Sequence, residues 1–180
     1  MIYLFLANGF EEVEALFTLD VIRRAGLEIK TVGVGETTTI TGAHGIPVIA
    51  DIHSSELECT APDAIILPGG MPGTTNLEES EVVVNAIHSA MQRGALVCAI
   101  CAAPSILGIM GYLKGKNATC FPGFEEYLDG ATFKDERVVL DGNVITAKGM
   151  GCAAEFGLAI VEKLLGKEKA DEIASSAFIK

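Results

Sequence analysis

Short, uninterrupted apolar runs that alternate with helical patterns constrain the fold of this chain more than any other feature. Strands that are apolar throughout are typical of a parallel sheet buried on both faces, and their alternation with helices predicts a doubly wound α/β fold. In such sheets ligands bind beyond the carboxyl ends of the strands. The four clearest runs are Ile2–Leu6, Ala64–Leu67, Ala95–Ile100 and Val144–Ala147.

The remaining segments complete this pattern. A chain of 180 residues is enough for one domain with a sizeable core, so we expect a single domain over residues 1–180. Shorter strands are predicted at 28–34, 46–50, 118–120 and 138–140. Helices are predicted at 11–25, 80–93, 102–112, 152–165 and 168–176.

The charge balance excludes some classes of partner. Lysine and arginine number 13 against 24 aspartates and glutamates, a net charge of −11, which argues against nucleic acid or an anionic membrane. The uncharged stretch Gly94–Leu113 has about the length of a membrane span, but Pro104 and Gly108 interrupt it, which favours a buried strand followed by a buried helix. Met1–Ala7 lacks a basic region before it and is interpreted as a first strand, not a signal peptide.

Cysteine usage indicates the compartment. Five cysteines are an odd number, and we expect free thiols in a reducing cytoplasm. They stand at positions 59, 98, 101, 120 and 152.

Cys101 falls where a strand passes directly into a predicted helix. Its neighbours two positions away on each side are Ala99 and Ala103, and small residues around a tight turn are how a nucleophile elbow lifts its central side chain clear of the backbone. The N-terminus of the following helix would favour the thiolate and lower the pKa of the thiol. A buried, inert cysteine fits the same stretch, and this alternative stays open.

Metal and disulfide chemistry are not expected. Cys98 and Cys101 form a C-x-x-C, but residues three apart on a strand point to opposite faces, so we expect Cys98 to pack in the core. The three histidines, at 44, 53 and 88, show no ligand spacing and all precede Cys101, which excludes a triad in which a histidine follows the cysteine in the chain.

Two other segments could activate the thiol. Glu14 lies at the edge of the buried face of the first helix, where burial would raise the pKa of its carboxyl and let it hold a proton toward a nearby sulfur. Gly69 and Gly70 belong to a glycine-rich loop after a strand, whose N–H groups could form an oxyanion site. A plain tight turn is the alternative for that loop.

The stretch Gly149–Ala154 formally matches the dinucleotide-binding pattern G-x-G-x-x-A after a strand. No further strand with an acidic residue follows it, so we interpret it as a loop that lines the same cleft at the strand ends.

Four stretches taken together resemble the ThiJ/PfpI family, in its deglycase branch, within the superfamily of class I glutamine amidotransferase-like proteins. The resemblance covers nearly the whole chain. It is carried by FEEVEALFTLDVIRRAG at 10–26, LPGGMPGTTNLEES at 67–80, AICAAPSILG at 99–108 and VITAKGMGCAAEFGLAIVEKLLG at 144–166.

The resemblance implies a flavodoxin-like three-layer α/β/α sandwich with a mostly parallel sheet, which forms a homodimer with the first helix near the interface. It implies that Cys101 is the reactive residue and that Glu14 is a protonated partner of the thiolate. Gly70 and Ala102 would supply the oxyanion-type N–H groups.

The sequence departs from the family pattern at three positions. Ala102 stands where peptidase members carry a histidine, which disfavours a peptidase. Phe121 stands where the deglycase branch usually has a histidine. His44 replaces a pocket arginine that some members take from the partner subunit, whereas Arg24 keeps its match.

By this resemblance we expect a cofactor-independent glyoxalase or deglycase that acts on small aldehydes such as methylglyoxal, or on their adducts with amines. The alternative is a redox sensor or chaperone in which Cys101 is oxidised to a sulfinic acid. A flavin-binding module on the same fold is a third hypothesis.

Overall fold

The computed structural model describes residues 1–58 and 61–179 of the chain, so Cys59 lies outside the described residues. A seven-stranded sheet in the order β10-β11-β7-β6-β1-β2-β5 forms its centre, and every neighbouring pair is parallel except β10 with β11. This confirms the predicted α/β fold. The strands are β1 (Ile2–Ala7), β2 (Ile29–Val34), β5 (Ile52–His53), β6 (Ala64–Leu67), β7 (Leu96–Ile100), β10 (Val138–Asp141) and β11 (Val144–Ala147).

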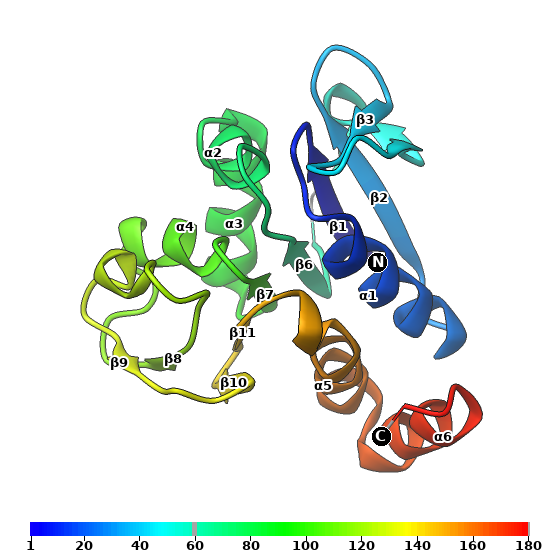
Figure 1. Cartoon of the computed structure of the whole chain (residues 1–180), viewed down its shortest axis with the longest axis vertical. Helices are drawn as coiled ribbons and strands as arrows, with labels where there is room; N and C mark the ends of the chain where they lie inside the picture. The colour runs from blue at the N-terminus through cyan, green and yellow to red at the C-terminus, as the bar shows by residue number, and fades with distance from the viewer. Residues whose placement is uncertain (59–60, 180) are drawn as a thin grey trace.

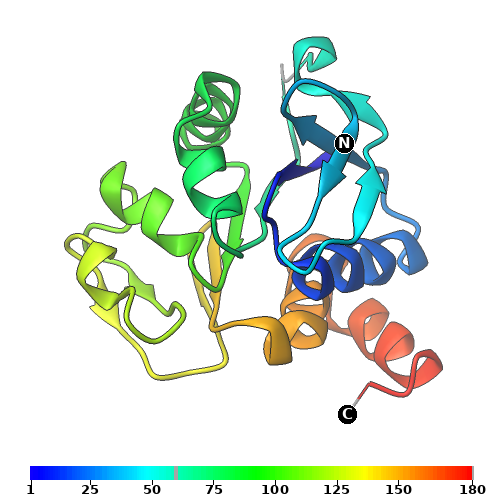
Figure 2. The ribbon, with the colours of Figure 1, turned by 45° about the horizontal axis from the view of Figure 1, so that its top comes forward.

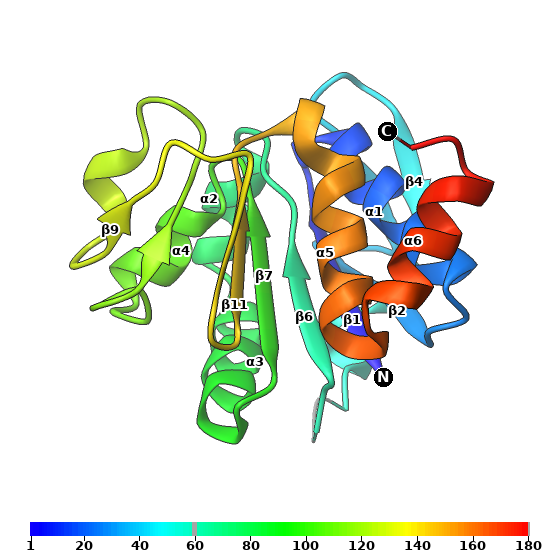
Figure 3. The same ribbon diagram turned by 90° about the horizontal axis from the view of Figure 1, so that it is seen from below.

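Helices cover both faces of the sheet (Figures 1 and 3). Alternate residues of β1 enter two separate cores: Leu4 and Leu6 pack in one, Phe5 and Ala7 in the other. The first core is covered by α1 (Glu12–Arg24), α5 (Ala153–Leu165) and α6 (Lys167–Ser176). The second is covered by α2 (Gly73–Glu78), α3 (Glu81–Arg93) and α4 (Pro104–Ile109).

The three layers pack closely around the site. Helix α1 lies on α5, and a Cβ added at Gly157 of α5 would come within 3.0 Å of the Val21 side chain of α1. Cys98 is fully buried in the first core, as predicted.

Some predicted boundaries were wrong. The helix expected over 102–112 spans only Pro104–Ile109, because residues 101–103 form the turn that leaves β7. The strand expected at 46–50 is β4 (Pro47–Ile49), which pairs with β3 (Thr39–Thr41) in a separate hairpin and does not join the main sheet (Figure 2). The sequence pattern predicts no helix at α2, because the two threonines and the asparagine of this segment are typical of loops.

Smaller elements complete the chain. The two-stranded pair β8 (Asn117–Ala118) and β9 (Thr132–Phe133) forms a third sheet. The described segments also contain the 3-10 helices η1 (Ser54–Glu56), η2 (Glu125–Tyr127) and η3 (Met150–Cys152). Within the described residues no helix combines the length and hydrophobicity that crossing a membrane requires.

Candidate active site

Cys101 adopts a left-handed backbone conformation, with φ of +65°, at the end of β7. Such a conformation is costly for a residue with a side chain and persists only where the surroundings impose it. Two hydrogen bonds do so here: the Cys101 N–H donates to the Ala147 carbonyl over 2.9 Å, and the Cys101 carbonyl accepts from the Phe121 N–H over 2.8 Å. The turn thus holds the half-buried thiol away from the path of the strand.

The small neighbours of the elbow are required by packing. Ala99 and Ala103 are completely buried, and Ala102 is 2% exposed. Helix α4 begins at Pro104, three residues beyond Cys101, so its N-terminus is farther along the chain than predicted. The N–H groups that interact with the sulfur are those of Gly70 and Ala102.

Glu14 lies in the first turn of α1 and is 1% exposed. Its Oε2 accepts a 2.8 Å hydrogen bond from the Gly69 N–H, and its own N–H is capped by the Glu11 carboxylate at 2.7 Å. Burial raises the pKa of the Glu14 carboxyl to about 7, and the charge of Glu11 adds a smaller increase. The hydrogen bonds from Gly69 and Cys101 lower this pKa, but by less than burial raises it. The predicted direction of this shift is confirmed.

The thiol pKa moves in the opposite direction from the one predicted. Burial, the negative charge of Glu14 and the hydrogen bond with its carboxylate raise the pKa of Cys101 to about 12, although the N–H groups of Gly70 and Ala102 lower it. The prediction that a helix N-terminus would lower the pKa was therefore wrong. Helix α4 is short and begins too far along the chain to offset desolvation and a neighbouring carboxylate.

Cys101 and Glu14 consequently titrate as one pair. Oε1 of Glu14 is buried without a hydrogen bond of normal geometry in the described part of the chain. A buried unpaired carboxylate oxygen is costly. The pair therefore holds one proton between about pH 7 and about pH 12. The two pKa values place that proton mainly on sulfur, and the form with a thiolate beside a protonated Glu14 is the minor, nucleophilic one.

Gly69 and Gly70 leave room for this pair. A Cβ at Gly69 would come within 2.6 Å of the Cys101 Cβ and 2.9 Å of Glu14 Oε2. Gly70 has φ of +89°, and a Cβ there would approach the Glu11 backbone nitrogen to 2.4 Å. Only glycine lets β6, α1 and the elbow meet so closely.

The two predicted pocket or interface residues pair with acidic residues of α1. Arg24 ends α1 and pairs with Asp20 in the solvent, about 15 Å along the helix from Glu14 at 1.5 Å per residue. His44 donates its backbone N–H to the Glu12 carboxylate over 2.7 Å, and its Nδ1 lies 2.8 Å from the same carboxylate.

Glu12 is a further residue of this region that no pattern in the sequence singles out, because acidic residues are common in the first turn of a helix. It is 4% exposed, and although burial raises its pKa, the hydrogen bonds from His44 and nearby N–H groups lower the pKa overall. Glu11, Glu12 and His44 each offer one ligand atom, and these three atoms lie within 4.8 Å of one another. That set could hold a metal ion, but the positive end of α1 opposes a cation.

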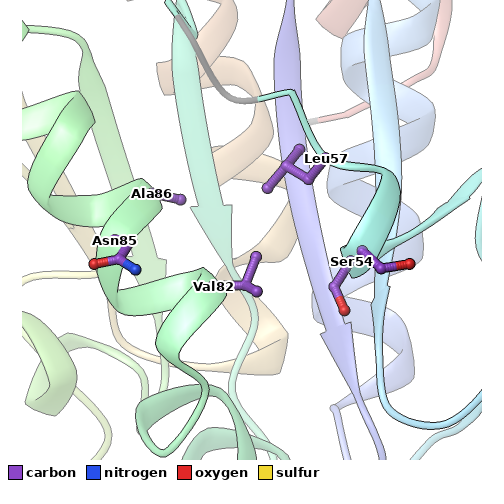
Figure 4. A pocket seen from close by; sticks show the side chains of 6 residues that line it. Ser54, Leu57, Val82, Asn85 and Ala86 are labelled. Carbon is purple, nitrogen blue, oxygen red and sulfur yellow. The ribbon is translucent and has the colours of Figure 1, made fainter.

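Hollows open at several places on the described part of the chain. One is lined by Phe121, Pro122 and residues 148–152, and another by residues including Met71, Ser105 and Phe124. Both border the loops around Cys101. A third, between η1 and the start of α3 (Figure 4), contains none of the predicted site residues; Ser54, Ser55, Leu57, Val82, Asn85 and Ala86 line it.

Comparisons with known proteins agree with this architecture. The chain is 38% identical over 173 residues to Protein DJ-1 homolog A of Arabidopsis thaliana, of which it spans only 44%, with 94% of this chain aligned. It is 35% identical to Protein dj-1beta of Drosophila melanogaster, over 97% of this chain and 94% of that protein. It is 34% identical to a Caenorhabditis elegans protein named glutathione-independent glyoxalase DJR-1.2, over 91% of this chain and 87% of that protein.

The fold matches as well as the sequence. The crystal structure of Drosophila melanogaster DJ-1beta superposes with a TM-score of 0.95 and 34% identity, covering 99% of this chain and 97% of that one. The model of the family described as "DJ-1/PfpI family" matches residues 1–163. With its sheet order, its cysteine elbow and these similarities along nearly the whole length, the chain belongs to the DJ-1/PfpI family.

Proposed function

We propose that the protein is a cofactor-independent glyoxalase or deglycase in which the Cys101 thiolate attacks the aldehyde carbon of a 2-oxoaldehyde or of its adduct with an amine. The observation that carries the proposal is a half-buried thiol beside a buried carboxyl whose pKa is about 7, with the N–H groups of Gly70 and Ala102 at the sulfur. A relative that is 34% identical bears the name of a glyoxalase.

The proposed steps need no external oxidant. Sulfur adds to the aldehyde carbon, and the resulting oxyanion takes the proton held by Glu14 to give a hemithioacetal. From an amine adduct the same hemithioacetal forms when sulfur displaces the amine, which leaves with that proton. The Glu14 carboxylate then removes the hydrogen on that carbon and returns a proton to the neighbouring carbon, which converts the hemithioacetal to a thioester and the ketone to an alcohol. Water cleaves the thioester, releasing a 2-hydroxy acid and the free thiol. The N–H groups of Gly70 and Ala102 stabilise the negative oxygen.

Turnover of methylglyoxal to lactate tests this proposal. We expect activity in the parent protein, loss in Cys101→Ala and a large decrease in Glu14→Gln. Cys98→Ala serves as the matched control, because that thiol is completely buried in the core, and it should retain activity. Turnover that survives both site substitutions, or that never appears in the parent, would exclude the enzyme.

A redox sensor is the second candidate. Two molecules of hydrogen peroxide would convert the thiolate to a sulfinate with release of two waters, and the N–H groups of Gly70 and Ala102 together with protonated Glu14 could bind the sulfinate oxygens. Intact mass after peroxide treatment tests it. Addition of two oxygens to the parent protein, with slower addition in Glu14→Gln, would support a sensor. Addition at an equal rate in the parent protein and in Glu14→Gln would not support a sensor.

We also propose a homodimer through the first helix. Val13, Phe17 and Ile46 expose large apolar surfaces and line one shallow apolar hollow on α1, which favours burial against a second copy. Sedimentation of the parent protein and of Phe17→Glu tests this. A parent that sediments as a monomer at micromolar concentration would rule the dimer out.

A further inference from the structure

The loops that surround Cys101 expose three large apolar side chains. Met71 and Met150 are each 53% exposed, and Phe121 is 47% exposed. They come from three loops far apart in the sequence: one after β6, one after β8 and one after β11. Exposed apolar residues that gather at a reactive site usually contact a ligand.

Each of these side chains is tied to the elbow through the backbone. Met71 directly follows Gly70, whose N–H interacts with the sulfur. The Phe121 N–H donates to the Cys101 carbonyl. Met150 follows β11, whose last carbonyl, that of Ala147, accepts from the Cys101 N–H. Backbone contacts therefore bring the three segments that carry these apolar residues to the elbow.

Phe121 and Met150 line one hollow together. The Phe121 ring comes within 3.3 Å of the position that a Cβ at Gly149 would occupy, so the glycine makes room for the ring. Lys148 is the single charged residue among those lining the hollow, and its ammonium already pairs with Asp135. The hollow therefore offers apolar contact and no free carboxylate or guanidinium.

We infer that this hollow binds an apolar substituent on the carbonyl carbon next to the reacting aldehyde, and that Phe121 determines this specificity. The inference rests on the proposed function and deepens it. The favoured substrate class is aryl or larger alkyl 2-oxoaldehydes, with phenylglyoxal as the probe, in preference to methylglyoxal. Edge or face contacts with an aryl group would use the Phe121 ring.

Steady-state kinetics give the first test. We expect kcat/KM for phenylglyoxal to exceed that for methylglyoxal in the parent protein, and Phe121→Ala to reduce this preference by about tenfold, the scale of one lost aromatic contact. Phe133→Ala is the matched control, since Phe133 is a 39% exposed phenylalanine on β9 and does not line the hollow. A preference that is the same in the parent and in Phe121→Ala would overturn the inference.

Alkylation of Cys101 tests the hollow without any turnover. Phenacyl bromide and bromoacetone each alkylate the thiolate: a carbon–sulfur bond forms and bromide leaves. The rate with phenacyl bromide is divided by the rate with bromoacetone, and this ratio is normalised to the same ratio measured with free glutathione. We expect a normalised ratio well above one in the parent, lowered in Phe121→Ala and unchanged in Phe133→Ala. If the protein shows this alkylation pattern but turns over neither 2-oxoaldehyde, the proposed enzyme is rejected while the apolar subsite is supported.

Two outcomes of the alkylation experiment contradict the inference. A normalised ratio near one in the parent would show that the hollow does not select apolar groups. If instead a second copy of the chain covers the apolar side chains, both reagents will react more slowly as protein concentration rises and the preference will disappear.

Discussion

The backbone N–H of Gly69 donates a 2.8 Å hydrogen bond to Oε2 of Glu14, joining the loop after β6 to the first turn of α1. This bond fixes one carboxyl oxygen, leaves the other buried without a bond of normal geometry, and sets the carboxyl beside the thiol at the end of β7. The chemistry of the site depends on this arrangement, since the thiol and the carboxyl share one proton.

The first prediction concerns the reactivity of Cys101 as a function of pH. Because Glu14 has a pKa of about 7 and Cys101 a pKa of about 12, the pair loses its first proton near pH 7. The alkylation rate by iodoacetamide, read by intact mass, should rise with a midpoint near pH 7 and then reach a plateau. In Glu14→Gln that step should vanish, and the thiol should titrate singly, with a pKa below about 12 because the charge of Glu14 is gone. An unchanged midpoint near pH 7 in this variant would contradict the shared proton.

The second prediction concerns stability. Folding raises the Glu14 pKa from 4.5 to about 7, so the native state holds the proton more tightly than the unfolded chain. This contribution is complete below about pH 4.5 and is lost as pH rises through about 7. Glu14→Gln should match the parent near pH 4 and exceed it near pH 8 by up to about 3 kcal/mol, at about 1.36 kcal/mol per pKa unit.

Urea unfolding at both pH values measures this difference in the free energy of unfolding. The exposed carboxylate Glu126 provides the control, and Glu126→Gln should change stability equally at the two pH values. A difference between Glu14→Gln and the parent that does not grow with pH would mean that Glu14 is ionised without penalty.

The third prediction concerns the glycine contact at the centre of the site. Gly69→Ala should separate Glu14 from Cys101, because the new Cβ would lie 2.6 Å from the Cys101 Cβ. We expect a loss of about 1–3 kcal/mol of stability from overpacking and loss of the alkylation step near pH 7. Gly151→Ala is the matched control in η3, where nothing lies within 4 Å of an added Cβ. Equal behaviour of the two variants would refute the steric role of Gly69.

The fourth prediction concerns the contact between His44 and Glu12. The hydrogen bond and the charge of Glu12 raise the pKa of His44, so protonated His44 stabilises the native state at low pH, and this contribution is lost as pH rises through the raised pKa. His44→Gln should therefore destabilise the protein more near pH 6 than near pH 9, measured by thermal unfolding. His53→Gln is the comparison, since its ring contacts Ser55 and the Gly35 carbonyl instead of a carboxylate. A pH-independent effect of His44→Gln would show that the ion pair contributes nothing.

Local sequence patterns were sufficient for most of the fold. The apolar runs around Leu4, Ile66 and Cys98 predicted buried parallel strands because a strand covered on both faces has no polar side to display. The small residues beside Cys101 predicted its elbow because only small side chains fit such a turn. Helix ends were placed less well: α4 is shorter than predicted, since its first residues belong to the turn.

The sequence by itself determined the sheet, the elbow and the position of Glu14 on the buried side of α1, because hydrophobic periodicity and small side chains act through near neighbours. Only the tertiary structure decided the energetics of the site. The pKa of about 12 for Cys101, the cluster of Glu12 with His44 and the apolar surroundings of Phe121 all depend on segments far apart in the chain. Desolvation and charge act through space, and the distances that set them exist only after the chain has folded.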